Sequence, residues 1–447
     1  MNEKMSKQTV VKNVVCPFCG CLCDDIEIYV DLKENKIVET ANACVLGTAK
    51  FMSANNVSHR ITTPMIRENG KLKEVSIDKA IEKAAQILVD AEWPLLYGWA
   101  STECEAQGVG VELAEEVGGC IDQTASVCHG PSILGVQDIG LSGATLGEIM
   151  NRADLIIYWG CNPVHAHPRH MSRYSVYRRG FFTERGVKDR LMVVVDPRET
   201  HTAKLANLYI QPKPGADFEL ITAIRTVLAG NELFIDEIGG VSKEEIIELV
   251  NILKNCKLGI VFFGLGLTMS RGKHRNIDIA LSLVRDLAAF TKFLICPMRG
   301  HWNVTGIGQV LAWQTGYPFA VDFSRGFPRY GPGEFTSNEV LARGEVDAAL
   351  VIAADAAANF PLQAAKKLAE IPLIAIDPHQ TPTTELADVL LPCSIAGIEA
   401  EGTGYRMDGV PIRVKKVIEA PEGCLSDKEI LERLLAKVKE LKAKKKA

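Results

Sequence analysis

Short, wholly apolar runs recur along most of the chain, separated by stretches with apolar residues at helical spacing. In the middle of the sequence these runs are DLIIYWG (154–160), RLMVVVD (190–196), LYIQP (208–212), KLGIVFFG (257–264) and KFLICP (292–297). Upstream, SIDKAIEKAAQILVDA (76–91) predicts a helix behind a Ser cap, PLLYGW (94–99) a strand, and residues 103–117 another helix. Continuous apolar strands separated by helices are typical of a parallel sheet covered on both faces, so we expect an α/β fold.

The apolar runs also form a faint internal repeat. One half reads ADLIIYWGCNP and then LMVVVDPRETHTAKLANLYIQP; the other reads VDAALVIAADAAANFP and then PLIAIDPHQTPTTELADVLLP. Each half has an Asp-led strand, a second strand that ends in Asp-Pro, a Thr-rich turn and a strand that ends in Pro. The repeat predicts two Rossmann-like nucleotide-binding domains with parallel sheets. We assign residues 61–140 and 340–447 to the first and residues 141–339 to the second.

The first 60 residues have a different pattern, with alternating apolar positions and crowded cysteines. Between Cys23 and Cys44, the segment DDIEIYVDLKENKIVET alternates apolar and polar residues on both sides of a Lys-Glu-Asn turn, which predicts a hairpin. Because a hairpin brings its ends together, Cys44 can return to the loop CPFCGCLCDD, which carries Cys16, Cys19 and Cys23.

These thiols could form disulfides, a zinc site or the ligand set of an iron–sulfur cluster. Zinc sites usually pair two Cys-x-x-Cys knuckles, whereas this loop has one, followed by a wider third gap and a distant fourth cysteine. The spacing therefore favours a [4Fe-4S] cluster on Cys16, Cys19, Cys23 and Cys44, without Cys21. We expect residues 1–60 to form a small iron–sulfur β domain, joined by a hairpin at about residues 395–417.

Composition and charge exclude several classes of function. The net charge is −5 and no basic stripe is present, which argues against a nucleic-acid partner. The longest apolar run, residues 258–269, is shorter than the roughly 20 residues that a membrane span needs, so no membrane partner is expected. The N-terminus has no apolar signal segment, so we expect a cytoplasmic protein. Cytoplasmic thiols stay reduced, which argues against disulfides for the thirteen cysteines.

Polar and glycine-rich turns follow the predicted strands, where open α/β sheets bind their ligands. Glycine turns let backbone N–H groups approach phosphates, and the carboxylate of Asp217 could accept the N–H groups of a guanine. Such turns in both halves suggest a dinucleotide cofactor on each. The candidate residues are Gly160, Asn162, Asp196, Arg198, Thr200, Pro214, Gly215, Asp217, Gly264 and Gly266 in one half and Asp377 in the other.

Taken in order, these motifs carry a resemblance to a known family. The Cys-x-x-Cys-x-x-x-Cys…Cys, Gly-x-Asn-Pro, Asp-Pro-Arg-x-Thr and Pro-x-x-Pro-Gly-Ala-Asp segments resemble those of the molybdopterin oxidoreductases, which include formate dehydrogenase. Within that family, CPFCGCLCDD, SVCHGPS, CPMRGHWNVTG and EGTGYRMDGVPI are similar to the B subunits of formylmethanofuran dehydrogenases. The resemblance implies that the C-terminal β-barrel domain of full-length relatives is lacking and belongs to a separate subunit.

The resemblance also implies the site residues. Cys128 stands where the family places its metal-ligating Cys or selenocysteine, so it would bind Mo or W carried by two molybdopterin guanine dinucleotides. His129, with a pKa expected near neutral, would move a proton, and Arg299 would bind formate or CO2. Further cofactor contacts are implied for Gly300, His301, Asn303, Gly306, Gly402 and Thr403. His165, His167 and His170 are read as cofactor-phosphate or interface residues rather than as a metal site.

The implied function is reduction of CO2 to formate with electrons from the [4Fe-4S] cluster. The formate would pass to an amidohydrolase-type subunit for N-formylation of methanofuran. The other expected partners are a β-barrel molybdopterin-binding subunit and ferredoxin-type subunits. Two alternatives remain open: a stand-alone formate dehydrogenase, and a non-catalytic electron-transfer scaffold.

Overall fold

The computed structural model describes residues 8–446, which group into two compact units. Unit 1 contains the described residues up to Val127, His301–Arg406 and the described residues from Pro411 onward. Unit 2 contains Cys128–Gly300 and Met407–Val410. Among the described residues, no helix combines the length and the apolar character that a membrane crossing requires.

This grouping differs from the predicted domain boundaries at residues 128–140, 301–339 and 407–410, and it places the described part of the first 60 residues within unit 1. Residues 301–339 fall in unit 1 because helix α12 (Val304–Thr315) packs on α3 (Cys104–Val117), and strand β15 (Val321–Asp322) pairs with β7 (Cys120–Gln123). Residues 128–140 fall in unit 2 because α4 (Gly130–Ile139) packs along α11 (His274–Leu287). Both assignments depend on contacts between segments far apart in the sequence.

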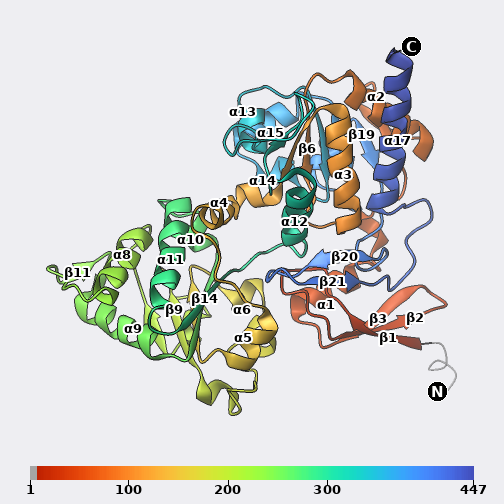
Figure 1. Cartoon of the computed structure of the whole chain (residues 1–447). Helices are drawn as coiled ribbons and strands as arrows, with labels where there is room; N and C mark the ends of the chain where they lie inside the picture. Colours follow the sequence, from red (N-terminus) through yellow and green to blue (C-terminus); the bar gives the residue numbers. More distant parts are fainter. Residues whose placement is uncertain (1–7, 447) are drawn as a thin grey trace. The chain divides into compact units, whose positions relative to one another are not determined.

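The N-terminal part of unit 1 is a three-stranded antiparallel sheet followed by a helix (Figure 1). Its elements are β1 (Gln8–Val14), β2 (Ile26–Asp31), β3 (Lys36–Ala41) and α1 (Val45–Ser53). Asp31 pairs with Lys36 across the turn, so the predicted hairpin is confirmed. The alternating residues Ile26, Ile28 and Val30 are buried, as the period of two requires.

A second hairpin, β20 (Gly402–Tyr405) and β21 (Pro411–Val414), packs through Val414 on the loop between β1 and β2. Ala396 and Val414 share an apolar cluster with Val15, Leu22 and Trp302. The residues around the cysteine loop are therefore held by two distant parts of the chain, at Trp302 and at residues 396–414.

The rest of unit 1 is a nine-stranded sheet in the order β16-β15-β7-β6-β17-β18-β19-β4-β5, parallel from β7 to β19. Its remaining strands are β4 (Met65–Glu68), β5 (Lys71–Glu74), β6 (Pro94–Gly98), β16 (Arg329–Tyr330), β17 (Ala348–Ile352), β18 (Leu373–Ile376) and β19 (Val389–Leu391). Helices α2 (Ile77–Asp90), α3 and α17 (Asp427–Lys446) bury apolar residues against this sheet (Figure 1). Ser76 caps α2, as predicted. The shorter helices are α13 (Ser337–Ala342), α14 (Ala356–Asn359), α15 (Leu362–Leu368) and α16 (Pro382–Leu386).

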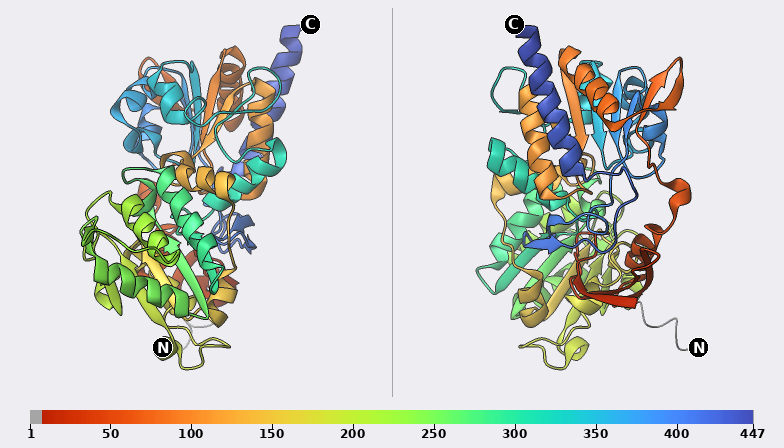
Figure 2. Two further views of the ribbon diagram at one scale, coloured as in Figure 1. Left: turned by 60° about the vertical axis from the view of Figure 1, so that its left-hand side comes forward. Right: turned by 90° about the vertical axis from the view of Figure 1, so that its right-hand side faces the viewer.

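Unit 2 is built on a five-stranded parallel sheet in the order β10-β9-β8-β13-β14 (Figure 2). Its strands are β8 (Leu155–Trp159), β9 (Leu191–Val195), β10 (Leu208–Ile210), β13 (Leu258–Phe263) and β14 (Lys292–Pro297). Every residue of β8 and β13 is buried, which confirms that these apolar runs are covered on both faces. The helices are α5 (Leu146–Arg152), α6 (Pro163–Ala166), α7 (His170–Arg173), α8 (Asp217–Leu228), α9 (Lys243–Asn255) and α10 (Leu265–Thr268), besides α4 and α11; β11 (Glu237–Ile238) and β12 (Val241–Ser242) form a small ribbon.

The internal repeat of the sequence corresponds to the same arrangement of three strands in both sheets. Strands β8, β9 and β10 lie side by side in parallel, and so do β17, β18 and β19. Asp196 follows the second strand of the first set, and Asp377 follows the second strand of the other. The mixed α/β class with parallel sheets is thus as the sequence predicted.

A buried ion pair ties two distant segments of unit 1 together. Nη2 of Arg60 lies 2.7 Å from Oε2 of Glu399, and both side chains are almost wholly buried. The same Glu399 oxygen accepts the backbone N–H of Ile395 at 2.7 Å. Loss of one partner leaves the other charge buried and uncompensated.

We therefore expect Arg60→Met to lower the free energy of unfolding by about 3–5 kcal/mol. The double variant Arg60→Met/Glu399→Leu, which removes both charges, should recover most of that loss. Denaturant unfolding of the two variants and the parent chain measures the difference. Equal destabilisation by the single and double variants would contradict this account.

Candidate functional site

The four predicted cluster ligands lie together at the start of unit 1. Cys44 is the N-cap residue of α1, and its Sγ accepts the backbone N–H of Gly47 at 3.4 Å. A Cβ added at Gly47 would lie 3.0 Å from Sγ of Cys16 and 3.7 Å from Sγ of Cys44, so a residue without a side chain leaves room for both sulfurs. The backbone N–H of Cys16 bonds the carbonyl of Cys23 at 2.9 Å and closes the loop.

The electrostatics of this loop indicate a set of mutually close thiols. Burial raises the pKa of the Cys16 thiol, and the charges of Cys19, Cys23 and Cys44 raise it further. A hydrogen bond from Cys21 lowers the pKa of Cys19. Thiolates gathered in this way repel one another unless a cationic core lies among them, so the donor set fits an iron–sulfur cluster.

Within residues 8–446, no three or more His, Cys, Asp or Glu side chains are arranged to hold a single metal ion. The absence of a single-ion site in this part of the chain does not contradict a cluster on the four cysteines. A [4Fe-4S] cube binds its thiolates at four separate irons, so its ligands do not meet at one point as zinc ligands do.

The cysteine assignment predicts different effects for neighbouring thiols. Cys16→Ser is expected to lower the iron content well below the about four irons per chain of an intact cluster. Cys21→Ala, in the same loop and likewise buried, should keep them, because Cys21 is placed outside the ligand set. Iron analysis of the anaerobically purified variants measures this. Loss of iron in Cys21→Ala alone would reverse the assignment.

In unit 2, the predicted glycine turns meet at the carboxyl ends of the two central strands. The order of the sheet reverses between β8 and β13, and ligands of open α/β sheets bind at such a reversal. The N–H of Gly266 bonds the carbonyl of Gly160 at 2.9 Å. A Cβ added at Gly160 would lie 2.8 Å from backbone atoms of the chain. A Cβ added at Gly264 or at Gly266 would lie 2.6 Å from the nearest atom of a neighbouring residue. This close backbone approach requires glycine and packs the turns after β8 and β13 directly against each other.

The polar residues predicted beside these glycine turns form some of their hydrogen bonds within the chain. The carboxylate of Asp217 accepts the indole N–H of Trp159 at 2.9 Å and the hydroxyl of Ser270 at 3.1 Å. Burial raises the pKa of Asp217, and each oxygen keeps a second acceptor position for a ligand N–H. Asp196, whose pKa is also raised by burial, accepts the N–H of Arg198 at 2.9 Å.

Four further residues of the prediction lie at the same edge of the sheet. The amide oxygen of Asn162 accepts the hydroxyl of Thr202 at 2.6 Å, and Thr200 accepts the N–H of Ala203 at 3.1 Å. Gly215 follows Pro214 with a φ of 80°, a left-handed conformation that favours glycine.

The three predicted catalytic residues lie near one another in unit 2. Cys128 and His129 stand at the start of α4, and Arg299 follows β14 at the carboxyl end of the sheet. Burial raises the pKa of the Cys128 thiol, while the Arg299 cation lowers it. Nε of Arg299 is buried without a hydrogen-bond partner among the described residues. An unpaired guanidinium N–H beside a thiol is suited to an anionic or polarised ligand.

The protonation state of His129 differs from the prediction. Burial, and then the Arg299 cation, lowers the pKa of His129 to about 3, so its ring is neutral at pH 7. Its Nδ1 lies 3.0 Å from the hydroxyl of Ser132. The expectation of a near-neutral pKa was wrong because the sequence does not reveal burial or the neighbouring charge.

His167 was not predicted as a neighbour of the catalytic residues. It is buried, and its Nε2 donates to the backbone carbonyl of Arg299 at 2.8 Å. This bond holds the backbone that carries the guanidinium. His170 instead lies against Tyr158, 3.0 Å from its hydroxyl, and His165 pairs with His201. The motif VHAHPRH gives three histidines three separate environments.

The candidates in unit 1 are mainly engaged within the chain. The amide of Asn303 donates to the carbonyl of Thr102 at 2.7 Å and accepts the N–H of Tyr405 at 2.8 Å. A Cβ at Gly306 would lie 2.0 Å from Oδ1 of Asn303. Thr403 donates its N–H and hydroxyl to Glu105, both at 2.8 Å.

His301 and Gly402 complete that set, with Gly300 as the last residue before unit 1. The backbone of His301 pairs with that of Cys19, which connects the cysteine loop to α12. A Cβ at Gly402 would lie 2.5 Å from that of Glu103. Contacts of these residues with a cofactor stay predictions.

Asp377 has cationic neighbours that the sequence did not indicate. Burial raises the pKa of Asp377 to about 7, and the charge of Lys50 opposes this shift. Burial lowers the pKa of Lys50, which also lies in the field of Arg60. Nε and Nη1 of Arg60 are buried without a partner among the described residues. Orphaned cationic donors near the end of β18 fit the phosphates of a second dinucleotide.

Comparisons with known proteins show the family to which the chain belongs. Residues 60–437 match the family model "Molybdopterin oxidoreductase". The chain is 59% identical to the B subunit of the tungsten-containing formylmethanofuran dehydrogenase 2 of Methanocaldococcus jannaschii, over 97% of this chain and 99% of the relative. Formate dehydrogenase H of Escherichia coli is 26% identical, over 95% of this chain and 68% of the relative.

A solved structure shares the fold. It is the formyltransferase/hydrolase complex FhcABCD of Methylorubrum extorquens with methylofuran, with a TM-score of 0.70, 21% identity, and coverage of 85% of this chain and 99% of that chain. The family match spans most of the sequence, and the high identity extends over almost its whole length. The chain therefore belongs to the molybdopterin oxidoreductase family, among the oxidoreductase B subunits of formylmethanofuran dehydrogenases.

Proposed function

We propose that this chain is the catalytic subunit of a formylmethanofuran dehydrogenase and reduces CO2 to formate at a Mo or W center. The observation that carries the proposal is the grouping of Cys128, His129 and Arg299 at the carboxyl end of the unit 2 sheet. The packed glycine turns at the carboxyl ends of β8 and β13 and the orphaned donors of Arg60 support two molybdopterin guanine dinucleotides. A [4Fe-4S] cluster on Cys16, Cys19, Cys23 and Cys44 would be the electron entrance.

The reaction consumes two electrons and one proton: CO2 + 2 e⁻ + H⁺ → HCOO⁻. A C–H bond forms, and the two oxygens share the negative charge of the product. Cys128 and the two dinucleotides would hold the metal center, which would supply the two-electron redox chemistry when bound.

The residues of the chain bind and orient the substrate. The guanidinium of Arg299 presents a forked set of donors to the oxygens of CO2 and of formate, whose charge grows along the reaction. His167 holds the Arg299 carbonyl and thereby the position of that fork. The ring of His129 is fixed beside Ser132 and, being neutral, adds no second positive charge to the site before the reaction begins. In this neutral form it would relay the proton that the reaction consumes, donating its N–H proton while its other ring nitrogen takes up a proton from the solvent side.

The remaining steps belong to partner subunits. Ferredoxin-type subunits would deliver electrons, and a β-barrel subunit would complete the cofactor pocket. Formate would pass to an amidohydrolase-type subunit, which joins it to methanofuran.

Metal analysis and EPR of the anaerobically purified complex test the proposal. About four irons for this chain, after the other subunits are subtracted, and one Mo or W support it. Iron without Mo or W would indicate an electron-transfer scaffold, and zinc without iron would contradict the cluster. Full CO2 reduction by the chain without partners would favour a stand-alone formate dehydrogenase.

A further inference from the structure

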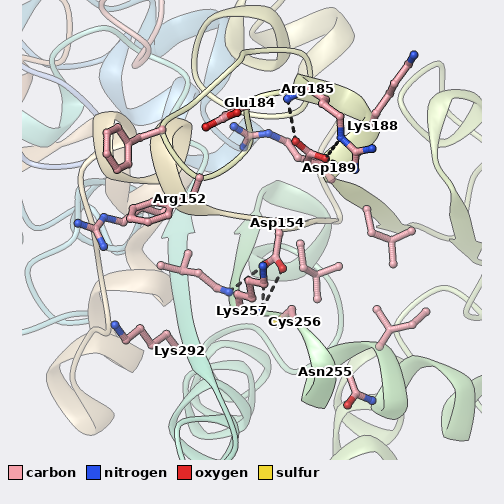
Figure 3. A pocket seen from close by; sticks show the side chains of 17 residues that line it. Arg152, Asp154, Glu184, Arg185, Lys188, Asp189, Asn255, Cys256, Lys257 and Lys292 are labelled. Carbon is pink, nitrogen blue, oxygen red and sulfur yellow. Dashed lines mark hydrogen bonds and ion pairs between the residues drawn. The ribbon is translucent and has the colours of Figure 1, made fainter.

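Unit 2 has a second surface feature, at the amino ends of the strands and thus at the sheet edge opposite to the candidate active site. A pocket of about 970 Å³ opens there (Figure 3). Leu155, Leu191 and Leu258, the first residues of β8, β9 and β13, lie among its lining residues. None of the residues assigned to the metal or the dinucleotides lines it.

Two aromatic side chains stand at this pocket with much of their surface in solvent. Phe181 is 75% exposed and Phe182 is 58% exposed. Their ring centroids are 4.9 Å apart, and the Arg152 guanidinium lies 5.0 Å from the Phe182 centroid. Adjacent exposed aromatic rings are typical of a surface that another molecule covers.

The segment that carries them, residues 177–190 (the aromatic loop), is held firmly by hydrogen bonds. The buried guanidinium of Arg190 donates to the carbonyl of Ala153 at 2.9 Å and to the hydroxyl of Thr183 at 2.7 Å. Asn151 accepts the backbone N–H groups of both Phe181, at 3.2 Å, and Phe182, at 2.9 Å. These hydrogen bonds order the backbone of the aromatic loop while both rings stay exposed.

Positive charge surrounds the pocket. The cationic rim consists of Arg152, Arg185, Lys188, Lys257 and Lys292 (Figure 3). Two of the three acidic lining residues are engaged within the chain. Asp154 accepts the backbone N–H groups of Lys257 and Leu258, and Asp189 pairs with Arg185. Arg185 is thereby paired, and Nε of Arg152 lies 3.9 Å from Oε1 of Glu148, whereas Lys188, Lys257 and Lys292 have no ion-pair partner among the described residues. On a chain whose net charge is −5, these three lysines are a local excess of positive charge.

We propose that the aromatic loop and the cationic rim form a docking surface for another protein subunit, one that presents carboxylates around an apolar hollow. The aromatic rings would be the anchors, and the cations would pair with the acidic rim of the partner. More than half of the surface of each phenylalanine is exposed, as is expected of anchors that a partner protein covers. The inference rests on the proposed function only in that the chain works as part of a complex.

Site-specific crosslinking in the intact complex tests this surface. Phe181 is replaced by the photoreactive analogue p-benzoylphenylalanine, and the crosslinked peptide is identified by mass spectrometry. We expect a crosslink to a different subunit, within a segment rich in Asp and Glu. The same replacement at Phe234, which is 93% exposed in unit 2 but does not line the pocket, should not reach that segment. A crosslink to a second copy of this chain, or no crosslink, would overturn the proposal.

Charge reversal supplies an independent measurement. The triple variant Lys188→Glu/Lys257→Glu/Lys292→Glu should lose the crosslinked subunit, with affinity about tenfold weaker or more, in native mass spectra of the purified complex. The control Lys71→Glu/Lys83→Glu/Lys439→Glu reverses as many exposed lysines in unit 1 and should retain it. Full retention in the first variant, or inorganic phosphate binding that depends on the same lysines with unchanged subunit content, would refute the docking role. Iron and Mo or W content reports separately on the proposed function.

Discussion

Cys128→Ser is expected to abolish CO2 reduction and to lower the Mo or W content of the complex. The thiolate is a soft ligand, and a serine hydroxyl at the same place is a harder and far less acidic donor. The loss should exceed about 100-fold, because even outer partners of metal ligands cost 10–100-fold when they are changed. Assays of formate oxidation and CO2 reduction, together with metal analysis, measure both effects.

The matched control for this variant is Cys256→Ser. Cys256 is also half-buried in unit 2 but lies at the amino end of the sheet, where its Sγ contacts the carbonyl of Leu253 at 3.3 Å. It should keep the metal content and the activity of the parent. Full activity in Cys128→Ser, with Mo or W retained, would remove Cys128 from the metal site. Iron content should stay unchanged in both variants, because neither residue belongs to the cysteine loop.

Arg299→Lys is the second large effect, with a reduction of kcat/KM for CO2 reduction by about 10²–10³-fold. Lysine keeps one positive charge, but it lacks the planar fork that pairs with two oxygens at once. The carbonyl that His167 holds is part of the backbone, so the replacement leaves that anchor in place. Steady-state kinetics with CO2 and with formate, on protein of measured metal content, give the effect.

Metal content separates the two roles that an arginine at this position can have. If Arg299 binds substrate, the variant keeps Mo or W and loses turnover; if it clamps the cofactor, both fall together. Arg275→Lys is the control, since this arginine is exposed on α11 and pairs with Asp278. Activity within twofold of the parent for Arg299→Lys would refute its substrate role.

Much of the fold was visible in local patterns. The wholly apolar runs became buried parallel strands, the alternating segment became the hairpin β2–β3, and the repeated Asp-Pro strands became equivalent positions in two sheets. Such patterns depend on which face of a strand is buried, and that information lies in neighbouring residues. The proximity of the four cysteines could be predicted in the same way, because three lie in one short loop and the hairpin brings Cys44 back to that loop.

Other features of the site had no local signal. His167 and Arg299 are far apart in the sequence, and Asp377 is far from Lys50 and Arg60. The low pKa of His129 depends on burial and on a cation brought in by another strand. The amide of Asn303, predicted to face a cofactor, bonds the backbone of Thr102 and Tyr405 because α3, α12 and β20 converge on it.

The sequence by itself determined the α/β class, the duplicated strands, the cysteine loop and the residue types of a molybdopterin oxidoreductase. The tertiary structure alone decided which unit holds residues 301–339, which histidine supports Arg299, and that the aromatic loop displays its rings beside a cationic rim. The physical reason is that secondary structure and motif spacing are set by residues close in the chain. Protonation, ion pairing and exposure depend on desolvation and on charges that meet only after distant segments have packed.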